Sequence, residues 1–506
     1  MNTHVSTSVK VAVGFLVFGV AGCGGGGGGS GYTPPASTPA PTVNFSQPTA
    51  AATINFGQAV TVAWTSTYTT SCTATTSSAA GGAFTGSQMA SGTQMVVPTA
   101  PGTYTYSLNC TGAGGTISTS ATVAVTSNLL TALAPTGAIT TIGSTVDPLN
   151  GDLNPYGLVI APATSGLITQ GDLVVCNFNN GVNNSTTPPS GNVQGEGTTI
   201  IGLHPTAGST PYRIAQSADL QGCNALTMLP DDSISAAAWS TVPNPLGENP
   251  LVSANGVVAT SFSSDTFAGP WGEAYVAATA SQPAAIYVSN APGGNISSGG
   301  TIDRISLHGD DQASFTEIVT GICSGGAPGG IFGPAGLTYD PSSDTLYVVA
   351  TSSASVIAIA GVSTIAQDGV VVNGQCAGTT PTAVPTFSGP SQASARVIAH
   401  GAPFNTPLSA ALLKNGDLVV GNADIGLSTP SATTNLLIEV SPALPGGFVG
   451  QPVQVDTGTP GALFGIAATV DASGNQIIYF NDDNNNAVMQ LGTPSSGGAS
   501  PYAVDR

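Results

Sequence analysis

The residues best suited to metal binding or proton transfer near neutral pH are the histidines, and this chain has four of them. They are His4, His204, His308 and His400. No two of them have the short spacing by which a helix or hairpin brings a pair of imidazoles to one metal ion. His204 and His308 each follow an apolar run, which places both at strand ends or in loops. The histidines therefore predict no metal site.

The densest group of oxygen ligands is the run 481–486, which reads Asn-Asp-Asp-Asn-Asn-Asn. Calcium is bound by roughly six to eight oxygens from carboxylates, amides and carbonyls. The run lacks the alternating order of a calcium-binding loop, and Asn and Asp also favour turns because they tolerate left-handed backbone. We therefore expect a solvated turn. A calcium ion at Asp482 and Asp483 is the alternative, and no other cofactor is expected.

Nucleophilic catalysis has no support in the sequence. The Gly-x-Ser-x-Gly elbow of serine hydrolases is absent. The glycine run 24–29 is not a phosphate-binding loop, because no strand precedes it and no Lys-Ser/Thr pair follows it. The sequence thus predicts no catalytic residue.

The first 22 residues have the layout of a secretory signal peptide. Lys10 precedes an apolar stretch, 11–20, that is too short for a permanent membrane helix. Ala21 and Gly22 then stand before Cys23, and this ending resembles the lipobox of bacterial lipoproteins. The resemblance implies that Cys23 becomes the acylated first residue of a protein in the cell envelope, at the outer membrane or surface of a bacterium. An ordinary signal peptide that contains a cysteine is the alternative.

The remaining six cysteines form an even set in an exported chain, which favours disulfides over metal ligands or catalytic thiols. No two of them form a CxxC pair. Three bridges are therefore expected, and sequence order suggests Cys72–Cys110, Cys176–Cys223 and Cys323–Cys376. Only the first of these pairs has independent support, from the compact unit that surrounds it.

The charge balance excludes one class of partner. The chain has 25 acidic residues and 6 basic ones. Nucleic-acid binding needs Lys and Arg to displace counterions, so it is not expected here. Adsorption to anionic lipid headgroups is disfavoured for the same reason. Contact with a membrane is expected only through the lipid on Cys23.

The elements that must position any site are strands. Short apolar runs are bounded by Gly, Asn, Asp and Pro, and long amphipathic helical patterns are absent, which predicts an all-β protein. After the signal, residues 23–42 form a Gly-rich and then Pro-rich tether. Two β domains are expected to follow, at 43–127 and at 128–506.

Residues 43–127 contain alternating strands around a tryptophan and a cysteine pair. Trp64 lies eight residues before Cys72, and Cys110 lies 38 beyond it. This pattern predicts a small sandwich, and its segments resemble the immunoglobulin-like domains of bacterial cell-surface proteins. The tryptophan comes before the first cysteine, so an antibody-type pairing is not implied. The resemblance implies a spacer, with an adhesive face as the alternative.

Residues 128–506 carry a weak repeat in which a Gly or Pro turn is followed by two short strands. The clearest copies are 154–160 with 171–177, 333–340 with 344–350, 406–411 with 415–422, and 463–467 with 474–481. A third strand follows each hairpin, as in 355–359 and 436–440. Such units cannot bury their own faces, so they must stack around an axis. The segments resemble NHL-type repeats, which implies a β-propeller.

Six blades are expected. A fifth, degenerate copy runs from 255–259 to 272–277, and a sixth is expected between Cys223 and Trp239. The irregular spacing predicts long insertions at 177–200, 240–250 and 370–400. Residues 136–143 are expected to supply the outer strand that closes the ring with the last blade.

These features together favour a lipid-anchored, non-enzymatic protein that presents its propeller as a binding or scaffold platform for an extracellular protein or glycan. The first alternative is an extracytoplasmic propeller enzyme, because some NHL-type propellers are lactonases or lyases with a metal at the axis. The second is a docking subunit of an envelope assembly. A cluster of His, Asp or Glu at the axis would favour the enzyme.

Overall fold

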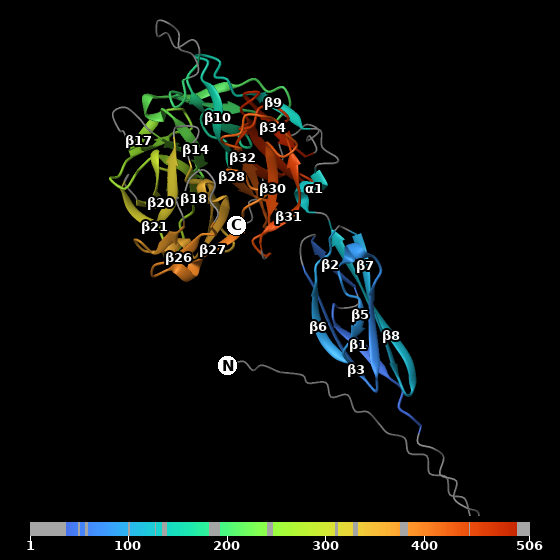
Figure 1. The fold of residues 1–506 in the computed structure, drawn as a ribbon. Helices are drawn as coiled ribbons and strands as arrows, with labels where there is room; N and C mark the ends of the chain where they lie inside the picture. Colours follow the sequence, from blue (N-terminus) through green and yellow to red (C-terminus); the bar gives the residue numbers. More distant parts are fainter. Residues whose placement is uncertain are drawn as a thin grey trace, which may run out of the picture.

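The computed structural model is all-β, with one short α-helix among the residues that it describes. The described residues are 37–48, 51–55, 59–99, 102–126, 128–133, 139–181, 193–239, 246–308, 312–326, 332–374, 383–444 and 446–492. Figure 1 shows two β bodies, a small one that is blue in the chain colouring and a larger ring that runs from green to red.

The small body is a sandwich of two sheets. One sheet has the order β1-β3-β6, and the other has the order β2-β8-β7-β4-β5. The strands are β1 (Thr42–Gln47), β2 (Ala51–Asn55), β3 (Val60–Thr67), β4 (Ser71–Thr76), β5 (Gly86–Gln88), β6 (Ser91–Val96), β7 (Gly102–Gly112) and β8 (Gly115–Thr126). Their inward side chains form one apolar core that includes Trp64.

The disulfide of the sandwich lies within a single sheet. Cys72 on β4 and Cys110 on β7 are directly paired residues of neighbouring antiparallel strands, with their Cα atoms 4.0 Å apart. Both cysteines are buried in the core beside Trp64. The pairing expected from the sequence is therefore present, and the bond crosses between two strands of the same sheet.

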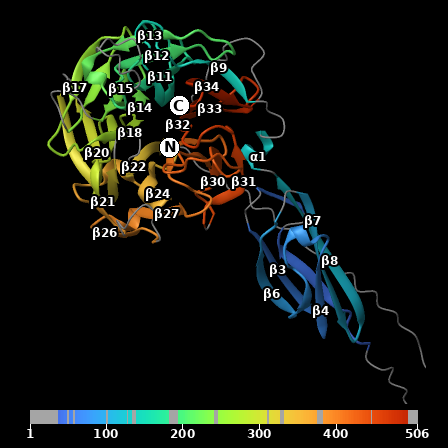
Figure 2. The same cartoon turned by 45° about the horizontal axis from the view of Figure 1, so that its top comes forward.

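The larger body is a β-propeller of six four-stranded units arranged around an axis, as Figure 2 shows. The six-bladed ring predicted from the repeats is confirmed. The innermost strands are β10 (Leu153–Ile160), β14 (Cys223–Met228), β18 (Pro270–Val276), β22 (Pro334–Asp340), β28 (Pro407–Leu412) and β32 (Leu463–Val470). Each of them contacts the innermost strands of both neighbouring blades. We number the blades one to six in this order.

The outer strands follow the innermost strand in sequence order. There are two exceptions: β25 (Val370–Asn373) and β26 (Thr386–Ser388) join blade three, and β9 (Thr140–Ser144) joins blade six. Blades one and two add β11 (Leu173–Asn179), β12 (Thr199–Leu203), β13 (Tyr212–Gln216), β15 (Ile234–Ala238), β16 (Asn249–Val252) and β17 (Val258–Phe262). Blades three and four add β19 (Ala285–Asn290), β20 (Gly294–His308), β21 (Gln312–Gly326), β23 (Thr345–Ala350), β24 (Ser355–Ala360) and β27 (Ala395–His400). Blades five and six add β29 (Leu418–Asn422), β30 (Leu436–Val440), β31 (Phe448–Gln454), β33 (Gln476–Asp482) and β34 (Ala487–Leu491).

The ring is closed by a strand from the beginning of the propeller. Strand β9 (Thr140–Ser144) pairs antiparallel with β34 and becomes the outer strand of blade six. Ile142 on β9 is buried in the core between blades six and one. The prediction that residues near 136–143 close the ring is confirmed.

The prediction that residues 255–259 and 272–277 form one repeat was wrong, because the two segments belong to different blades. Residues 258–262 form β17, the outer strand of blade two, whereas 270–276 form the innermost strand of blade three. The expected hidden copy is blade two itself, which begins at Cys223 on β14. The insertion at 370–400 holds β25 (Val370–Asn373) and β26 (Thr386–Ser388), which extend the sheet of blade three.

A short helix, α1 (Leu129–Leu133), lies between the two bodies along the chain and packs against blade five. Leu130 is fully buried in the core between blades five and six. Its backbone N–H donates to the buried carboxylate of Glu439 over 2.7 Å. The polypeptide that enters the propeller is therefore anchored to it by both apolar packing and a buried hydrogen bond.

Candidate ligand-binding cup at the propeller axis

Equivalent positions of the six innermost strands form a ring around the axis. The first set of positions carries mostly large side chains: Tyr156, Asn224, Trp271, Ala335, Leu408 and Phe464. The next residue is always small: Gly157, Ala225, Gly272, Gly336, Ser409 and Gly465. Every innermost strand has a β-bulge at this point. A bulge can direct two successive residues of one strand toward the propeller axis.

The small residues are required by the close approach of neighbouring blades. A Cβ atom on Gly272 would lie 2.0 Å from the carbonyl oxygen of Ala335, and one on Gly465 would lie 2.5 Å from that of Tyr156. Neither neighbour can move, because both are backbone atoms of the next innermost strand. The glycines thus bring the six strands together tightly enough to form one continuous wall.

Aromatic rings close one end of the axis. The ring of Tyr156 stacks between Phe178 and Phe464, with centroids 4.2 Å and 3.9 Å apart. Trp271 contacts the same group, and all four side chains are buried. Burial, and then the nearby carboxylate of Asp483, raises the pKa of Tyr156, so its hydroxyl stays neutral. The axis is therefore not an open channel through the ring.

The other end of the axis widens into an open cavity of about 480 Å³, which we call the cup. Each innermost strand contributes three consecutive residues to its wall, and Pro162 adds one more. This volume lies in the usual range for small-molecule sites. The cup is thus shared by all six blades and belongs to no single repeat.

A smaller cavity of about 70 Å³, which we call the neck, lies between the cup and the aromatic end. The two cavities share one wall residue from each innermost strand: Leu158, Leu226, Glu273, Leu337, Ala410 and Ile466. The neck is therefore the continuation of the cup along the axis. Its far wall is formed by Tyr156, Asn224, Trp271, Leu408 and Phe464.

The rim of the cup combines aromatic faces with hydroxyl groups. Tyr275 and Tyr339 are half-buried in its wall, and Thr227 and Thr338 stand beside them. The hydroxyl of Tyr339 donates to Asp344 over 3.1 Å, which holds its ring in place. Burial, and then Asp344, raises the pKa of Tyr339 to about 12, so the rim hydroxyl is neutral. The wall contains no Lys, Arg or His.

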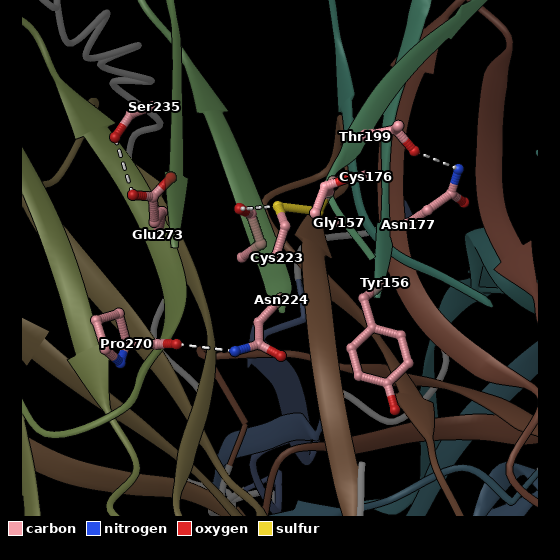
Figure 3. The surroundings of a disulfide bond; sticks show 12 residues. Tyr156, Gly157, Cys176, Asn177, Thr199, Cys223, Asn224, Ser235, Pro270 and Glu273 are labelled. Atoms are coloured by element: carbon pink, nitrogen blue, oxygen red, sulfur yellow. Dashed lines mark hydrogen bonds between the residues drawn. A yellow bond between two sulfur atoms is a disulfide. The ribbon is translucent and has the colours of Figure 1, made fainter. Parts of the chain in front are cut away.

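Glu273 is the single acidic residue of the wall. Figure 3 shows that its carboxyl group points away from the axis toward Ser235, whose hydroxyl donates to it over 2.9 Å. Asn249 also donates to the same carboxyl oxygen. Burial raises the pKa of Glu273 to about 8, so this carboxyl group is protonated at neutral pH. The cup therefore presents no charged side chain to a ligand.

A second disulfide joins blades one and two close to this wall. Cys176 on β11 is bonded to Cys223, the first residue of β14, with their Cα atoms 6.0 Å apart (Figure 3). The pairing expected from sequence order is present. It is located next to Gly157, whose added Cβ would lie 3.0 Å from the Cys176 sulfur. The bond thus fixes the spacing of two innermost strands at the neck.

Of the third predicted cysteine pair, Cys323 and Cys376, only Cys323 lies among the described residues. Cys323 lies on β21 and takes part in a disulfide. Cys376 is outside the described residues, so its pairing with Cys323 stays a prediction. Cys23, with the signal peptide and most of the tether, also lies outside the described residues. Among the residues that the structure describes, no helix is long and apolar enough to cross a membrane.

Residues 483–486 of the acidic run form the turn between β33 and β34, whereas Asn481 and Asp482 are buried at the end of β33. Asp482 accepts hydrogen bonds from the backbone and side-chain nitrogen atoms of Asn485, at 3.3 Å and 2.7 Å. Burial, and then Asp482, raises the pKa of Asp483 to about 6. The carboxylate of Asp482 therefore accepts hydrogen bonds from Asn485, but its burial, with that of Asn481, differs from the solvated turn expected from the sequence. Asp483 instead lies near Tyr156 at the aromatic end.

The histidines lie apart from the cup. His204 forms an exposed pair with the buried carboxylate of Asp172, 2.6 Å from its Nδ1 atom, and Tyr212 donates to the same carboxylate. His308 lies 2.9 Å from the hydroxyl of Ser314. His400 is on β27, where burial lowers its pKa. Within the described ranges, no three His, Cys, Asp or Glu side chains are grouped to hold a metal ion.

Asn224 and Glu273 were not predicted as site residues. Asn224 lies in the repeat whose innermost strand begins with neither the proline nor the glycine found in other copies. Glu273 replaces a residue that is apolar in the five other blades: Leu158, Leu226, Leu337, Ala410 and Ile466. An alignment of the six innermost strands would have exposed both exceptions. That alignment depends on the strand bounds, which the irregular spacing of the repeats conceals.

No protein-family model matches the sequence, and a comparison with curated proteins finds no match. Many solved structures are similar to this chain, among them three from Bacteroides species at low identity. The first is an auxiliary nutrient binding protein from Bacteroides ovatus, with 11% identity and a TM-score of 0.38, over 87% of this chain and 95% of that one.

The others are from Bacteroides thetaiotaomicron. One is a quinonprotein alcohol dehydrogenase-like protein, with 10% identity and a TM-score of 0.25, over 83% of this chain and 97% of that one. The other is a putative phosphatase, with 8% identity and a TM-score of 0.30, over 90% of this chain and 98% of that one. Likeness at this level carries no conclusion about function, which must come from the site itself.

Proposed function

We propose that this protein is a lipid-anchored protein of the bacterial cell envelope whose propeller binds an extracellular protein or glycan in the axial cup. The observation that carries this proposal is the cup itself, an open cavity of about 480 Å³ walled by all six blades. Concave sites of this size with mostly apolar walls and a few polar groups are typical of ligand binding.

The placement at the envelope is supported by the sequence. The small-small-Cys ending at Cys23 resembles a lipobox, and the Gly- and Pro-rich residues that follow it can hold the folded part away from a membrane. The acidic surface leaves the lipid as the means of attachment. The sandwich at 42–126 then serves as the spacer that carries the propeller.

Anchoring is tested by expression of the full chain in a bacterium with an alkyne-labelled fatty acid. The wild-type protein is expected to carry the label and to sediment with membranes. Cys23→Ala should lose the label and appear in the soluble fraction. A labelled Cys23→Ala variant, or an unlabelled wild type, would contradict the anchor.

Binding is tested with the wild-type protein and with Ala468→Trp, a change on the cup wall at a half-buried residue. Its indole should fill much of the cup without removing a side-chain hydrogen bond. The probes are purified envelope proteins and a panel of neutral and anionic oligosaccharides, in biolayer interferometry. At least one probe should bind the wild type and fail to bind Ala468→Trp. Equal binding by both proteins would place the site elsewhere and overturn the proposal.

A further inference from the structure

The neck presents one side-chain amide in a largely apolar wall. Among the six equivalent axial positions, Asn224 holds the only amide. Its side chain is 6% exposed and lines the neck beside the aromatic end of the axis. Burial of a polar group without hydrogen-bond partners is costly. The partners of the amide nitrogen and of the amide oxygen are therefore considered in turn.

The amide of Asn224 has a fixed orientation. Its nitrogen atom, Nδ2, donates to the carbonyl oxygen of Pro270 over 2.9 Å, which joins blade two to blade three. The oxygen atom, Oδ1, must then point the opposite way, and Figure 3 shows it directed away from Pro270, on the side of Tyr156. Within the described part of the chain, this oxygen has no hydrogen-bond donor. It is an acceptor without a partner at the end of the cup.

Two other polar side chains of the neck, Ser409 and Glu273, have hydrogen-bond partners within the protein. The hydroxyl of Ser409 donates to the backbone carbonyl of Phe464. The carboxyl group of Glu273 points between blades two and three, toward Ser235. Glu273 Oε2 also lacks a donor among the described residues, but its carboxyl group is directed toward Ser235. Asn224 Oδ1 is therefore the acceptor assigned to a ligand in the neck.

On the basis of the proposed function, we infer that the ligand is a neutral glycan whose terminal hydroxymethyl group enters the neck and donates a hydrogen bond to Asn224 Oδ1. The neck, at about 70 Å³, has room for such a group and excludes a whole sugar ring. The sugar rings then occupy the cup, where Tyr275 and Tyr339 offer aromatic faces and Thr338 a hydroxyl. Sugars match this mixture, because each ring has an apolar face and a belt of hydroxyls.

The charges of the site favour a neutral sugar. The cup and neck contain no Lys, Arg or His to pair with a uronate or phosphate, and the chain as a whole is acidic. An anionic ligand would lose its hydration in the cup without gaining a partner. A protein ligand would have to insert a narrow side chain with a hydrogen-bond donor into the neck. A hydroxymethyl group places the same donor there and loses less conformational freedom on binding.

The test measures the binding of neutral oligosaccharides by isothermal titration calorimetry to the wild-type protein and to Asn224→Leu. The probes are tetra- to hexasaccharides of the malto, cello and manno series, with oligogalacturonate as the charged counterpart. At least one neutral series should bind, and oligogalacturonate should not. Asn224→Leu should weaken binding about tenfold, as expected for one buried hydrogen bond.

Thr351→Val is the matched control. The hydroxyl of Thr351 donates to the carbonyl oxygen of Pro407 over 2.7 Å, so the change removes the same type of contact between blades four and five without touching the cup. Its affinity should stay within about twofold of the wild type. A similar loss in both variants would show that Asn224 acts only through blade packing, and would overturn the inference.

A second measurement needs no variant. The terminal 6-deoxy analogue of the bound sugar lacks the donor, and it should bind the wild-type protein about tenfold more weakly than the parent sugar. Equal affinity of the two sugars would overturn the inference even where Asn224→Leu fails to fold.

The two proposals fail in different ways. If envelope proteins or oligogalacturonate bind, and Ala468→Trp blocks them while neutral sugars stay unbound, the cup functions but the glycan inference is wrong. If no probe binds in a manner that Ala468→Trp blocks, the proposed function itself is wrong.

Discussion

Replacement of Glu273 by Gln should make the protein more stable at alkaline pH. Glu273 is 6% exposed, and its Oε2 atom has no hydrogen-bond partner among the described residues. Burial raises its pKa from 4.5 to about 8. Between these two values the folded protein holds one proton that the unfolded chain has lost. The free energy of unfolding therefore falls as the pH rises from about 5 to about 8, and then levels off.

The size of the effect follows from the shift. A change in pKa from 4.5 to about 8 corresponds to about 5 kcal/mol of stability lost across this pH range. Gln has the same shape and no charge, so Glu273→Gln should match the wild type near about pH 5. Near about pH 9 it should be more stable by about 3 to 5 kcal/mol, the lower value allowing for water entering the site.

The assay is urea unfolding at both pH values, followed by tryptophan fluorescence, for the wild type and Glu273→Gln. The difference between the two proteins removes the contributions of other titrating groups such as Asp483, because distant sites add. Asp471→Asn, on an exposed turn, is the control and should show no change in its difference from the wild type over this range. If the stability difference of Glu273→Gln is the same at both pH values, the assignment of a buried neutral carboxyl group is wrong.

Three further changes probe the frame that positions the cup. Joint replacement of Cys176 and Cys223 by Ser should lower the free energy of unfolding by up to about 4 kcal/mol, from the loop of 47 residues that the bond closes, and an unchanged urea midpoint would contradict this. Gly272→Ala should cost about 3 kcal/mol or prevent folding, because its Cβ would lie 2.0 Å from a backbone oxygen of the next blade; a normal melting temperature would refute the close approach. Arg213→Met should cost about 3 kcal/mol at neutral pH by leaving the buried Asp147 unpaired. Burial acts to raise the pKa of Asp147, but hydrogen bonds from Arg213 and two backbone amides outweigh it and hold the pKa below its usual value. The cost should therefore vanish as the pH falls through that lowered pKa, and a cost that persists in acid would contradict the pairing.

The repeat could be predicted from the sequence in those copies where similar turn residues recur. Asn415-Gly416 and Asp344 mark tight turns with positive φ, and the hairpins they begin lie where the pattern predicts. The closing strand around Ile142 was predictable for a topological reason, since a ring of blades must be joined by one end of the chain. Blade two was hidden because its innermost strand begins with Cys223, Asn224 and Ala225, whereas each other copy keeps a proline, a glycine or both at these positions.

The chemical properties of the site residues could not be predicted from the sequence to the same extent. The pair of His204 and Asp172 joins residues 32 apart in sequence, and no spacing rule brings them together. The protonation of Glu273 depends on burial by blade two, which the residues around it do not indicate. Asn224 acquires its role from Pro270, one blade away. Each of these features arises from contacts between strands that only the closed ring creates.

The most direct test of a ligand-binding cup is hydrogen–deuterium exchange of the full-length protein with and without the best-binding oligosaccharide. We predict that protection appears at the cup ends of the innermost strands, above all β14, β18 and β22, and is lost in Ala468→Trp. Protection confined to the sandwich, or to the outer strands of the blades, would contradict the claim that the axis of the propeller is the binding site.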